Sequence, residues 1–434
     1  SSLPTSSSRA CEAACGTTPL RASDRSPGVS DADYVVYVTA YPYASTGTIA
    51  SASYCRQDSA QSRPLVGHIN WNPQLLSNET TVDAVRIENQ ISTMIHELGH
   101  ALGIAGAPWF PGGMLELNDT VTTNSETSFG TTTVTRNGKT ATLLVSPRAL
   151  REARSYFACE TLDGVEIEDG GGSGTAGVHW EKRLFETEML NGLDTTPLSW
   201  MSPVTFGFLE DTSWYRMNYS YCQNRSLTWG YQKGCDFVTT PCNATANAAS
   251  GEYCFETTDT GTDSEPFPRQ CTHDLLSIGI CRATSWSSVP MNFQYFADAT
   301  KGGVSDVRDY CPTVEFATMC ISSASVDAQA IYGSTYGSSS RCFASNLINS
   351  SFTASTVRSA RCFATACGES SISLTIDGVS VPCPTDGSAG NATLPSSLTA
   401  SYTGYVTCPA YATLCLRNGT HRVVVDALTA LLRA

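Results

Sequence analysis

The sequence predicts an α+β protein of 434 residues, and three observations support this. The first hundred residues alternate short β-branched or aromatic runs with one long helical pattern. A hairpin signal and a short helix follow in the middle of the chain. Beyond about residue 235 the sequence changes to short strand-like runs and loops that hold thirteen of the 18 cysteines. We therefore divide the chain into segments 1–105, 106–234 and 235–434.

The first segment contains two predicted strands and one predicted helix. The runs "DYVVYVTA" (33–40) and "PLVGHINW" (64–71) are rich in β-branched and aromatic residues and are flanked by turn residues. Residues 80–104 carry apolar side chains at helical spacing, and Gly103 can end this helix. The positions that define the spacing are Val82, Val85, Ile91, Ile95, Leu98 and Leu102.

The central segment begins with a predicted hairpin. Asn137 and Gly138 separate two alternating runs in "TTTVTRNGKTATLLV", a strong signal for a type I′ turn. A short helix should follow, with Ser146 as N-cap and Pro147 at the first helical position. In "EDGGGSGTAGVHWEKRLFETEML" (168–190) we expect a glycine-rich loop and then a second helical segment after the histidine.

The charge balance excludes several classes of partner. The formal net charge is −14, which argues against nucleic acid or an anionic membrane surface as the main partner. No apolar run reaches the ~18–20 residues that a spanning helix needs, so no transmembrane segment is expected in this chain.

The cysteines and glycosylation motifs indicate the secretory pathway. The 18 cysteines lack tight C-x-x-C pairs, so disulfides are a better interpretation than zinc ribbons. Together with eight N-x-S/T motifs they predict an extracellular or cell-surface protein. The candidate glycosylation sites are Asn78, Asn118, Asn218, Asn224, Asn243, Asn349, Asn391 and Asn418.

The predicted helix carries the pattern His-Glu-x-x-His. His96 and His100 lie four residues apart, so their imidazoles share one face, opposite the apolar stripe. Glu97 can hold a metal-bound water. The alternative is an amphipathic helix with two incidental histidines, which is improbable in a chain with only six histidines. The pattern therefore predicts a zinc site.

A zinc site of this type needs a third protein ligand. Four other histidines are available: His68, His179, His273 and His421. His68 lies in a predicted strand, where a packing role is the default. His273 and His421 lie in the cysteine-rich segment, where a structural or solvated role is the default. His179 follows the glycine-rich loop, which can bring it under the helix, so we favour it. Glu166 and Glu168 remain competing carboxylate ligands, because spacing does not exclude them.

These motifs resemble the leishmanolysins, a family of surface zinc proteases of the metzincin clan. The resemblance runs through "HELGHALGI", a long insertion and "GGGSGTAGVHWEKRLFETEML". It continues through "FGFLEDTSWYRMNY", "WGYQKGC", "FQYFADA", "DYCP" and "YVTCPAYATLC" and covers nearly the whole chain. In that family an inserted segment displaces the last ligand of the metzincin motif. The resemblance therefore implies His179 as that ligand.

The resemblance also implies a fold and its subdomains. The expected fold is metzincin-like, with a split catalytic cleft and a disulfide-rich, mostly β or irregular C-terminal domain at 235–434. Residues 1–105 would be a catalytic subdomain, incomplete at its N-terminus, that carries the zinc helix. Residues 106–234 would carry the third ligand and the Met-turn. The family's Met-turn methionine falls at Leu190, directly after Met189, so we expect Leu190 beneath the imidazoles. A cleaved N-terminal fragment of the same precursor is an expected partner.

The resemblance further implies eight disulfides. The leftover Cys11 and Cys222 are expected to form a ninth. The eight pairs are Cys15–Cys55, Cys159–Cys235, Cys242–Cys311, Cys254–Cys281, Cys271–Cys342, Cys320–Cys362, Cys367–Cys415 and Cys383–Cys408.

The implied function is a zinc endopeptidase that acts on protein or peptide substrates. One Zn²⁺ would be held by His96, His100 and His179, and Glu97 would be the general base for a zinc-bound water. One alternative is a catalytically silent surface or adhesion protein that keeps the scaffold. A second is a zinc hydrolase that acts on a non-peptide bond.

Overall fold

The computed structural model describes most of the chain between residues 14 and 415. The Cys11–Cys222 pair, His421, Asn78, Asn118, Asn224 and Asn418 lie outside the described residues. The described ranges are 14–15, 18–24, 28–44, 47–58, 60, 63–76, 84–104, 130–192, 198–221, 229–255, 269–323, 332–352 and 360–415.

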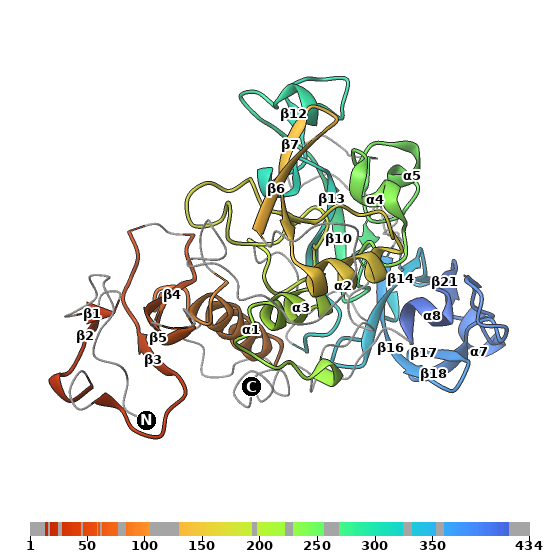
Figure 1. Ribbon diagram of the computed structural model, residues 1–434. Coiled ribbons are helices and arrows are strands. Elements are labelled where there is room, and N and C mark those ends of the chain that lie inside the picture. The colour runs from red at the N-terminus through yellow and green to blue at the C-terminus, as the bar shows by residue number, and fades with distance from the viewer. Residues whose placement is uncertain are drawn as a thin grey trace.

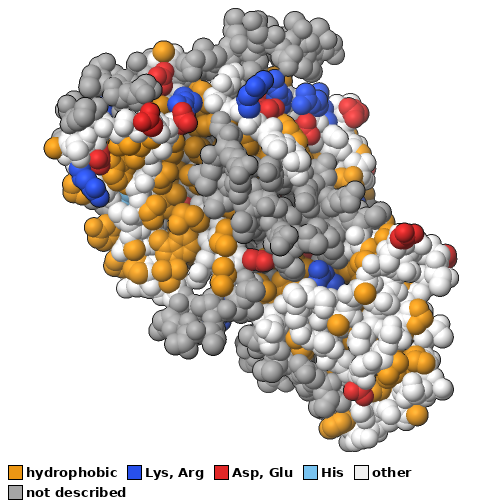
Figure 2. Space-filling model, turned by 90° about the horizontal axis from the view of Figure 1, so that it is seen from below, with side chains coloured by type: hydrophobic (Ala, Val, Ile, Leu, Met, Phe, Trp, Pro, Cys, Tyr) orange, Lys and Arg blue, Asp and Glu red, His pale blue; other side chains and the backbone are white. Residues whose placement is uncertain are grey.

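The structure is a mixed α+β assembly whose segments follow one another in space. Figure 1 shows the N-terminal sheet and the large C-terminal sheet at opposite ends, with the central helices and hairpin between them. Figure 2, which views the molecule from below, shows a surface made mainly of uncharged side chains, with the C-terminal part at lower right. Within the described residues, no helix has the length and apolar character needed to cross a bilayer.

The N-terminal sheet has the strand order β3 (Val35–Thr39), β5 (Pro64–Trp71) and β4 (Ala50–Gln57). β3 is parallel to β5, and β4 is antiparallel to it. The two predicted strands are confirmed. β4 was not expected from the sequence, because "ASASYCRQ" has little β-branched or aromatic content to signal a strand. The remaining pair is β1 (Ala14–Cys15) with β2 (Thr18–Pro19).

The predicted zinc helix is α1 (Ala84–Ala101), which packs against β4 and β5. Ile95, Leu98 and Leu102 are buried in the main core, as their spacing predicts. Gly103 has φ +130°, a conformation that favours glycine, so the helix ends where the sequence predicts.

The predicted hairpin consists of β6 (Gly130–Arg136) and β7 (Lys139–Val145), with β8 (Val165–Ile167) as a third strand. Asn137 and Gly138 have φ values of 51° and 81°, which a type I′ turn requires. The hairpin prediction is confirmed.

The short helix is α2 (Pro147–Phe157), with Ser146 at the N-cap position. The Ser146 side chain does not cap the helix and instead donates a hydrogen bond to Asp211. The Asp211 carboxylate accepts the backbone N–H groups of Arg148 (2.8 Å) and Ala149 (3.2 Å). The cap therefore comes from the end of α3 (Pro203–Asp211), 65 residues along the chain.

The helical segment expected after His179 was a wrong prediction. Residues 180–190 form turns and short bridges, with Trp180 N–H donating to the Leu190 carbonyl (3.0 Å) and Met189 N–H to that of Trp200 (2.8 Å). Every residue from 180 to 191 is buried. An amphipathic helix would have one solvent-facing side, and this segment has none. Buried polar side chains satisfy its backbone groups instead.

The C-terminal segment is dominated by short antiparallel strands, in agreement with the expectation. Its largest sheet has the order β18 (Val379–Pro382), β17 (Ile372–Ile376), β16 (Ala360–Cys367), β14 (Ser340–Ser345), β21 (Val406–Cys408) and β19 (Gly390–Asn391). A three-stranded sheet has the order β13 (Thr313–Met319), β10 (Ser277–Arg282) and β9 (Gln270–Cys271). Two small pairs are β11 (Thr284–Ser285) with β12 (Lys301–Gly302), and β15 (Ile348–Asn349) with β20 (Tyr402–Thr403).

The remaining helices in the described parts of the chain are short. They are α4 (Cys235–Thr239), α5 (Thr245–Ala248), α7 (Ser396–Thr399), α8 (Tyr411–Leu414) and the 3₁₀ turns η2 (Tyr219–Tyr221), η3 (Met291–Phe293) and η4 (Asp306–Arg308).

The described residues contain eight disulfides, and they coincide with the eight pairs implied by the resemblance. Six of them join cysteines between 242 and 415, where the secondary-structure elements are shortest. Such cross-links stabilise a fold mainly by restricting its unfolded chain.

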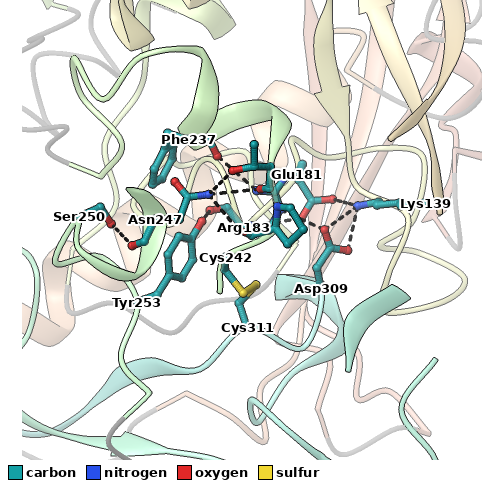
Figure 3. The surroundings of a disulfide bond; sticks show 12 residues. Lys139, Glu181, Arg183, Phe237, Cys242, Asn247, Ser250, Tyr253, Asp309 and Cys311 are labelled. Carbon is teal, nitrogen blue, oxygen red and sulfur yellow. Dashed lines mark hydrogen bonds and ion pairs between the residues drawn. A yellow bond between two sulfur atoms is a disulfide. The ribbon is translucent and has the colours of Figure 1, made fainter. Parts of the chain in front are cut away.

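A buried ion network joins the central hairpin to the C-terminal segment, beside the Cys242–Cys311 disulfide (Figure 3). The Lys139 ammonium lies 2.9 Å from carboxylate oxygens of Glu166 and Glu181 and 2.8 Å from Asp309. Arg183 donates to the same Asp309 carboxylate at 3.0 Å. Burial alone would lower the pKa of Lys139, but the surrounding carboxylates raise it well above its ordinary value.

Candidate metal centre

Two separate elements bring three histidines together. His96 and His100 lie one turn apart on α1, and His179 comes from the end of the glycine-rich loop, 79 residues after His100. Their Nε2 atoms are 3.0 Å (His96 to His100), 3.1 Å (His100 to His179) and 3.2 Å (His96 to His179) apart. The edges of a tetrahedral zinc site with Zn–N bonds of ~2.0–2.1 Å measure about 3.3–3.4 Å. The triangle is therefore close to the size that zinc requires.

The other ring nitrogens fix the tautomers. Nδ1 of His96 donates to the Met189 carbonyl (2.6 Å), Nδ1 of His179 to that of Thr175 (2.8 Å), and Nδ1 of His100 to that of Ile104. A neutral imidazole has one N–H, so each Nε2 is left with a lone pair. Three lone pairs that converge in this way repel one another unless a cation lies among them. The donor set therefore fits a zinc ion.

Burial keeps these histidines neutral. It lowers the pKa of His96, lowers that of His100 well below its ordinary value and lowers that of His179 to about 3. Neutral imidazole is the form that binds a metal, so the site is ready for an ion at neutral pH.

Glu97 lies beside the cluster and is 5% exposed. Burial raises the pKa of its carboxyl to about 8. Its Oε2 atom has no hydrogen-bond partner among the described residues. A buried carboxyl oxygen without a partner is costly in a folded protein, and such groups are common at functional sites.

The histidines and Glu97 line one cleft of about 630 Å³. One wall is formed by residues 47–52 at the start of β4, and the helix α1 contributes a second. The remainder comes from the glycine-rich loop (173–179) and the turn at 189–192. Among the described residues that line the cleft, only Glu97 and the histidines have ionisable side chains.

The other candidate ligands have different partners. His68 lies in β5, and its Nε2 is 2.8 Å from the Thr39 hydroxyl. His273 packs edge-to-face against Trp229. Glu166 belongs to the Lys139 network, and Glu168 accepts backbone N–H groups from its own loop and from Lys182. None of these four side chains joins the histidine cluster.

The two residues at the Met-turn position have different surroundings. Leu190 is fully buried, and its side chain lies against Gly99, next to His100. That Leu190 forms the apolar floor beneath the imidazoles stays a prediction. Met189 provides the carbonyl that binds His96 and is among the residues that line the cleft.

Two residues that were not expected from the sequence, Glu188 and Asn191, organise the turn beneath the histidines. Asn191 donates from Nδ2 to the carbonyls of Glu186 (3.0 Å) and Glu188, and Glu188 accepts the Leu190 N–H. Their only local signal is that they lie in a segment rich in charged and polar residues. That pattern ordinarily indicates a solvated surface.

Comparison with known proteins agrees with this geometry. The leishmanolysin (peptidase M8) family model matches residues 7–421. A leishmanolysin-like peptidase of Caenorhabditis elegans is 32% identical over 332 residues, covering 66% of this chain and 49% of the relative. The leishmanolysin-like peptidase of Drosophila melanogaster is 30% identical over 332 residues, covering 66% and 47%.

A leishmanolysin homolog from Crithidia fasciculata is 28% identical over 431 residues, covering 96% of this chain and 60% of the relative. The chain spans about half the length of the insect and nematode relatives. The family model covers almost all of the sequence and includes the three clustered histidines. The chain therefore belongs to the leishmanolysin family.

Proposed function

We propose that this protein is a zinc endopeptidase of the secretory pathway or cell surface. The observation that carries the proposal is the convergence of three Nε2 atoms beside Glu97, in a cleft large enough for a peptide segment. Family membership adds the reaction class, because the relatives are named as peptidases. The eight disulfides support an oxidising compartment.

His96, His100 and His179 are the residues that would hold one zinc ion. When bound, zinc polarises the scissile carbonyl and makes water acidic enough to be deprotonated near neutral pH. Glu97 would accept a proton from the attacking water at its free carboxylate oxygen and pass it to the leaving amine. The dication would also oppose the effect of burial and favour the ionised form of Glu97 that this role requires.

The cleft wall supports the expected division of the catalytic region. Residues 47–52 and α1 come from the predicted segment 1–105, and residues 173–192 come from 106–234. We propose that a peptide lies between these two segments. Beyond Glu97 and the histidines, the part of the lining that the structure describes is uncharged, which favours substrates without a strict requirement for a charged side chain in the cleft.

The experiment measures zinc content and proteolysis in the same preparation. Purified protein should contain about one zinc per chain and cleave a denatured protein, with a chelator abolishing cleavage and added zinc restoring it. Glu97→Gln should retain zinc and lose activity by roughly 10²–10⁴-fold, because it removes the general base and leaves the three metal ligands in place. Zinc-loaded wild-type protein that cleaves no peptide bond would support the catalytically silent alternative. Unchanged activity in Glu97→Gln would remove Glu97 from the mechanism.

A further inference from the structure

One peptide group lies between a zinc-binding histidine and a buried carboxylate. The carbonyl of Met189 accepts the Nδ1–H of His96 at 2.6 Å. The N–H of Leu190, which belongs to the same peptide group, donates to the Glu188 carboxylate. Because a trans peptide is planar, its N–H and C=O point in opposite directions, and fixing one fixes the other. Glu188 therefore holds the carbonyl that orients His96.

A second path leads from Glu188 toward His179. The Glu188 carboxylate also accepts the hydroxyl hydrogen of Thr205, and the Thr205 oxygen accepts the indole N–H of Trp180 at 2.9 Å. Trp180 directly follows His179, and its backbone N–H donates to the Leu190 carbonyl at 3.0 Å. The residue next to the third ligand is thus fixed at both its backbone and its side chain.

The surroundings of Glu188 are unusual for a carboxylate. Its side chain is fully buried, and within the described part of the chain no lysine or arginine forms an ion pair with it. It is held by hydrogen bonds from Leu190, Thr205 and the backbone N–H of Ser202 (3.0 Å). Burying an unpaired charge is costly, so an apolar residue would serve better if the position only filled space. What a carboxylate adds here is an acceptor for three donors, one in its own turn and two at the start of α3.

We propose that Glu188 is a positioning residue for the metal centre. It holds the Met189–Leu190 peptide against His96 and, through Thr205 and Trp180, restrains the backbone next to His179. The inference rests on the proposed function, in which these histidines bind zinc. It assigns to Glu188 an effect on metal affinity and coordination, and no direct contact with the metal.

The test uses the full chain with two variants and one matched control. Glu188→Gln keeps the size but places an amide NH₂ among groups that donate hydrogen bonds. Thr205→Val removes the hydroxyl that links Glu188 to Trp180 and leaves the Leu190 and Ser202 hydrogen bonds to Glu188 in place. Asp211→Asn is the control, because Asp211 is also a buried carboxylate that accepts two backbone N–H groups, yet it caps α2 and does not touch the histidines. Zinc affinity is measured by competition with a chromogenic chelator, and ligand geometry by the visible spectrum of the Co²⁺-substituted protein.

Glu188→Gln should lower zinc affinity about 10–100-fold, as loss of outer-shell partners does in other zinc proteins, and should shift the Co²⁺ bands. Thr205→Val should give a smaller loss, and Asp211→Asn should leave both readouts unchanged although it lowers stability. Wild-type affinity in Glu188→Gln, or an equal loss in Asp211→Asn, would overturn the inference. If Glu188→Gln does not fold, Thr205→Val becomes the test of the inference. Wild-type zinc affinity in Thr205→Val would then overturn the inference. Wild-type protein that binds no zinc would instead refute the proposed function.

Discussion

Replacing Lys139 with methionine should strongly destabilise the junction between the central hairpin and the C-terminal segment. The Lys139 ammonium is surrounded by the carboxylates of Glu166, Glu181 and Asp309 at 2.8–2.9 Å. Methionine retains most of the side-chain volume, so the main change is the loss of one positive charge. The carboxylates would then have Arg183 as their remaining close cation among the described residues.

The free energy of protonating a buried carboxyl sets the size of the stability loss in Lys139→Met. Burial alone would raise the pKa of Glu166, but Lys139 and Arg183 hold it below its ordinary value of 4.5. Without Lys139 we expect Glu166 to take up a proton in the folded state, because burial is the largest influence on its pKa and raises it. At pH 7 this costs about 1.36 × (7 − 4.5) ≈ 3.4 kcal/mol. Removing one partner of a buried ion pair typically costs a similar amount, about 3–5 kcal/mol.

The sign of the pH dependence follows from the same group. A carboxyl whose pKa is lowered by folding stabilises the protein above its unfolded pKa, and that contribution is lost as the pH falls. The loss in free energy of unfolding caused by Lys139→Met should therefore be largest at neutral pH, and it should shrink by about 1.4 kcal/mol per pH unit toward pH 4.5.

The assay is urea unfolding of the oxidised protein at pH 7 and pH 5, followed by tryptophan fluorescence. Arg151→Met on the neighbouring helix α2 is the control, because Arg151 is 54% exposed, pairs with Glu152 and is not among the charges that act on Glu166. Such an exposed pair contributes about 0–1 kcal/mol. A Lys139→Met deficit below ~1 kcal/mol at pH 7, or one that does not shrink on acidification, would refute the reasoning.

Three further predictions concern the metal site and the surface. His179→Ala should lose zinc on dialysis, because two histidines remain, and metal analysis that finds full occupancy would place the third ligand elsewhere. Leu190→Met should change stability by less than ~1.5 kcal/mol and activity only modestly, since the volumes are similar; activity that appears only in the variant would favour the silent alternative. Mass spectrometry of tryptic peptides from secreted protein should find glycans on the exposed Asn218, Asn243 and Asn391, and unmodified asparagine at all three would contradict this.

The sequence by itself determined the local elements that carry the chemistry. The helical spacing of Ile95, Leu98 and Leu102 set the buried side of α1, so His96 and His100 had to share the opposite face. The Asn-Gly pair set the β6–β7 turn. These features depend on residues a few positions apart, where periodicity and turn preference act directly.

Tertiary structure decided which distant groups meet. The motifs could be matched to a family, but the residues alone left His179, Glu166 and Glu168 open as the third ligand. Only the folded chain brings His179 to the helix and directs Glu166 to Lys139. The segment after His179 resembles a solvated helix in sequence because its charged side chains give no sign of partners that lie far away in the chain. Long-range pairing of buried polar groups has no local period, so it is determined only when the core closes around them.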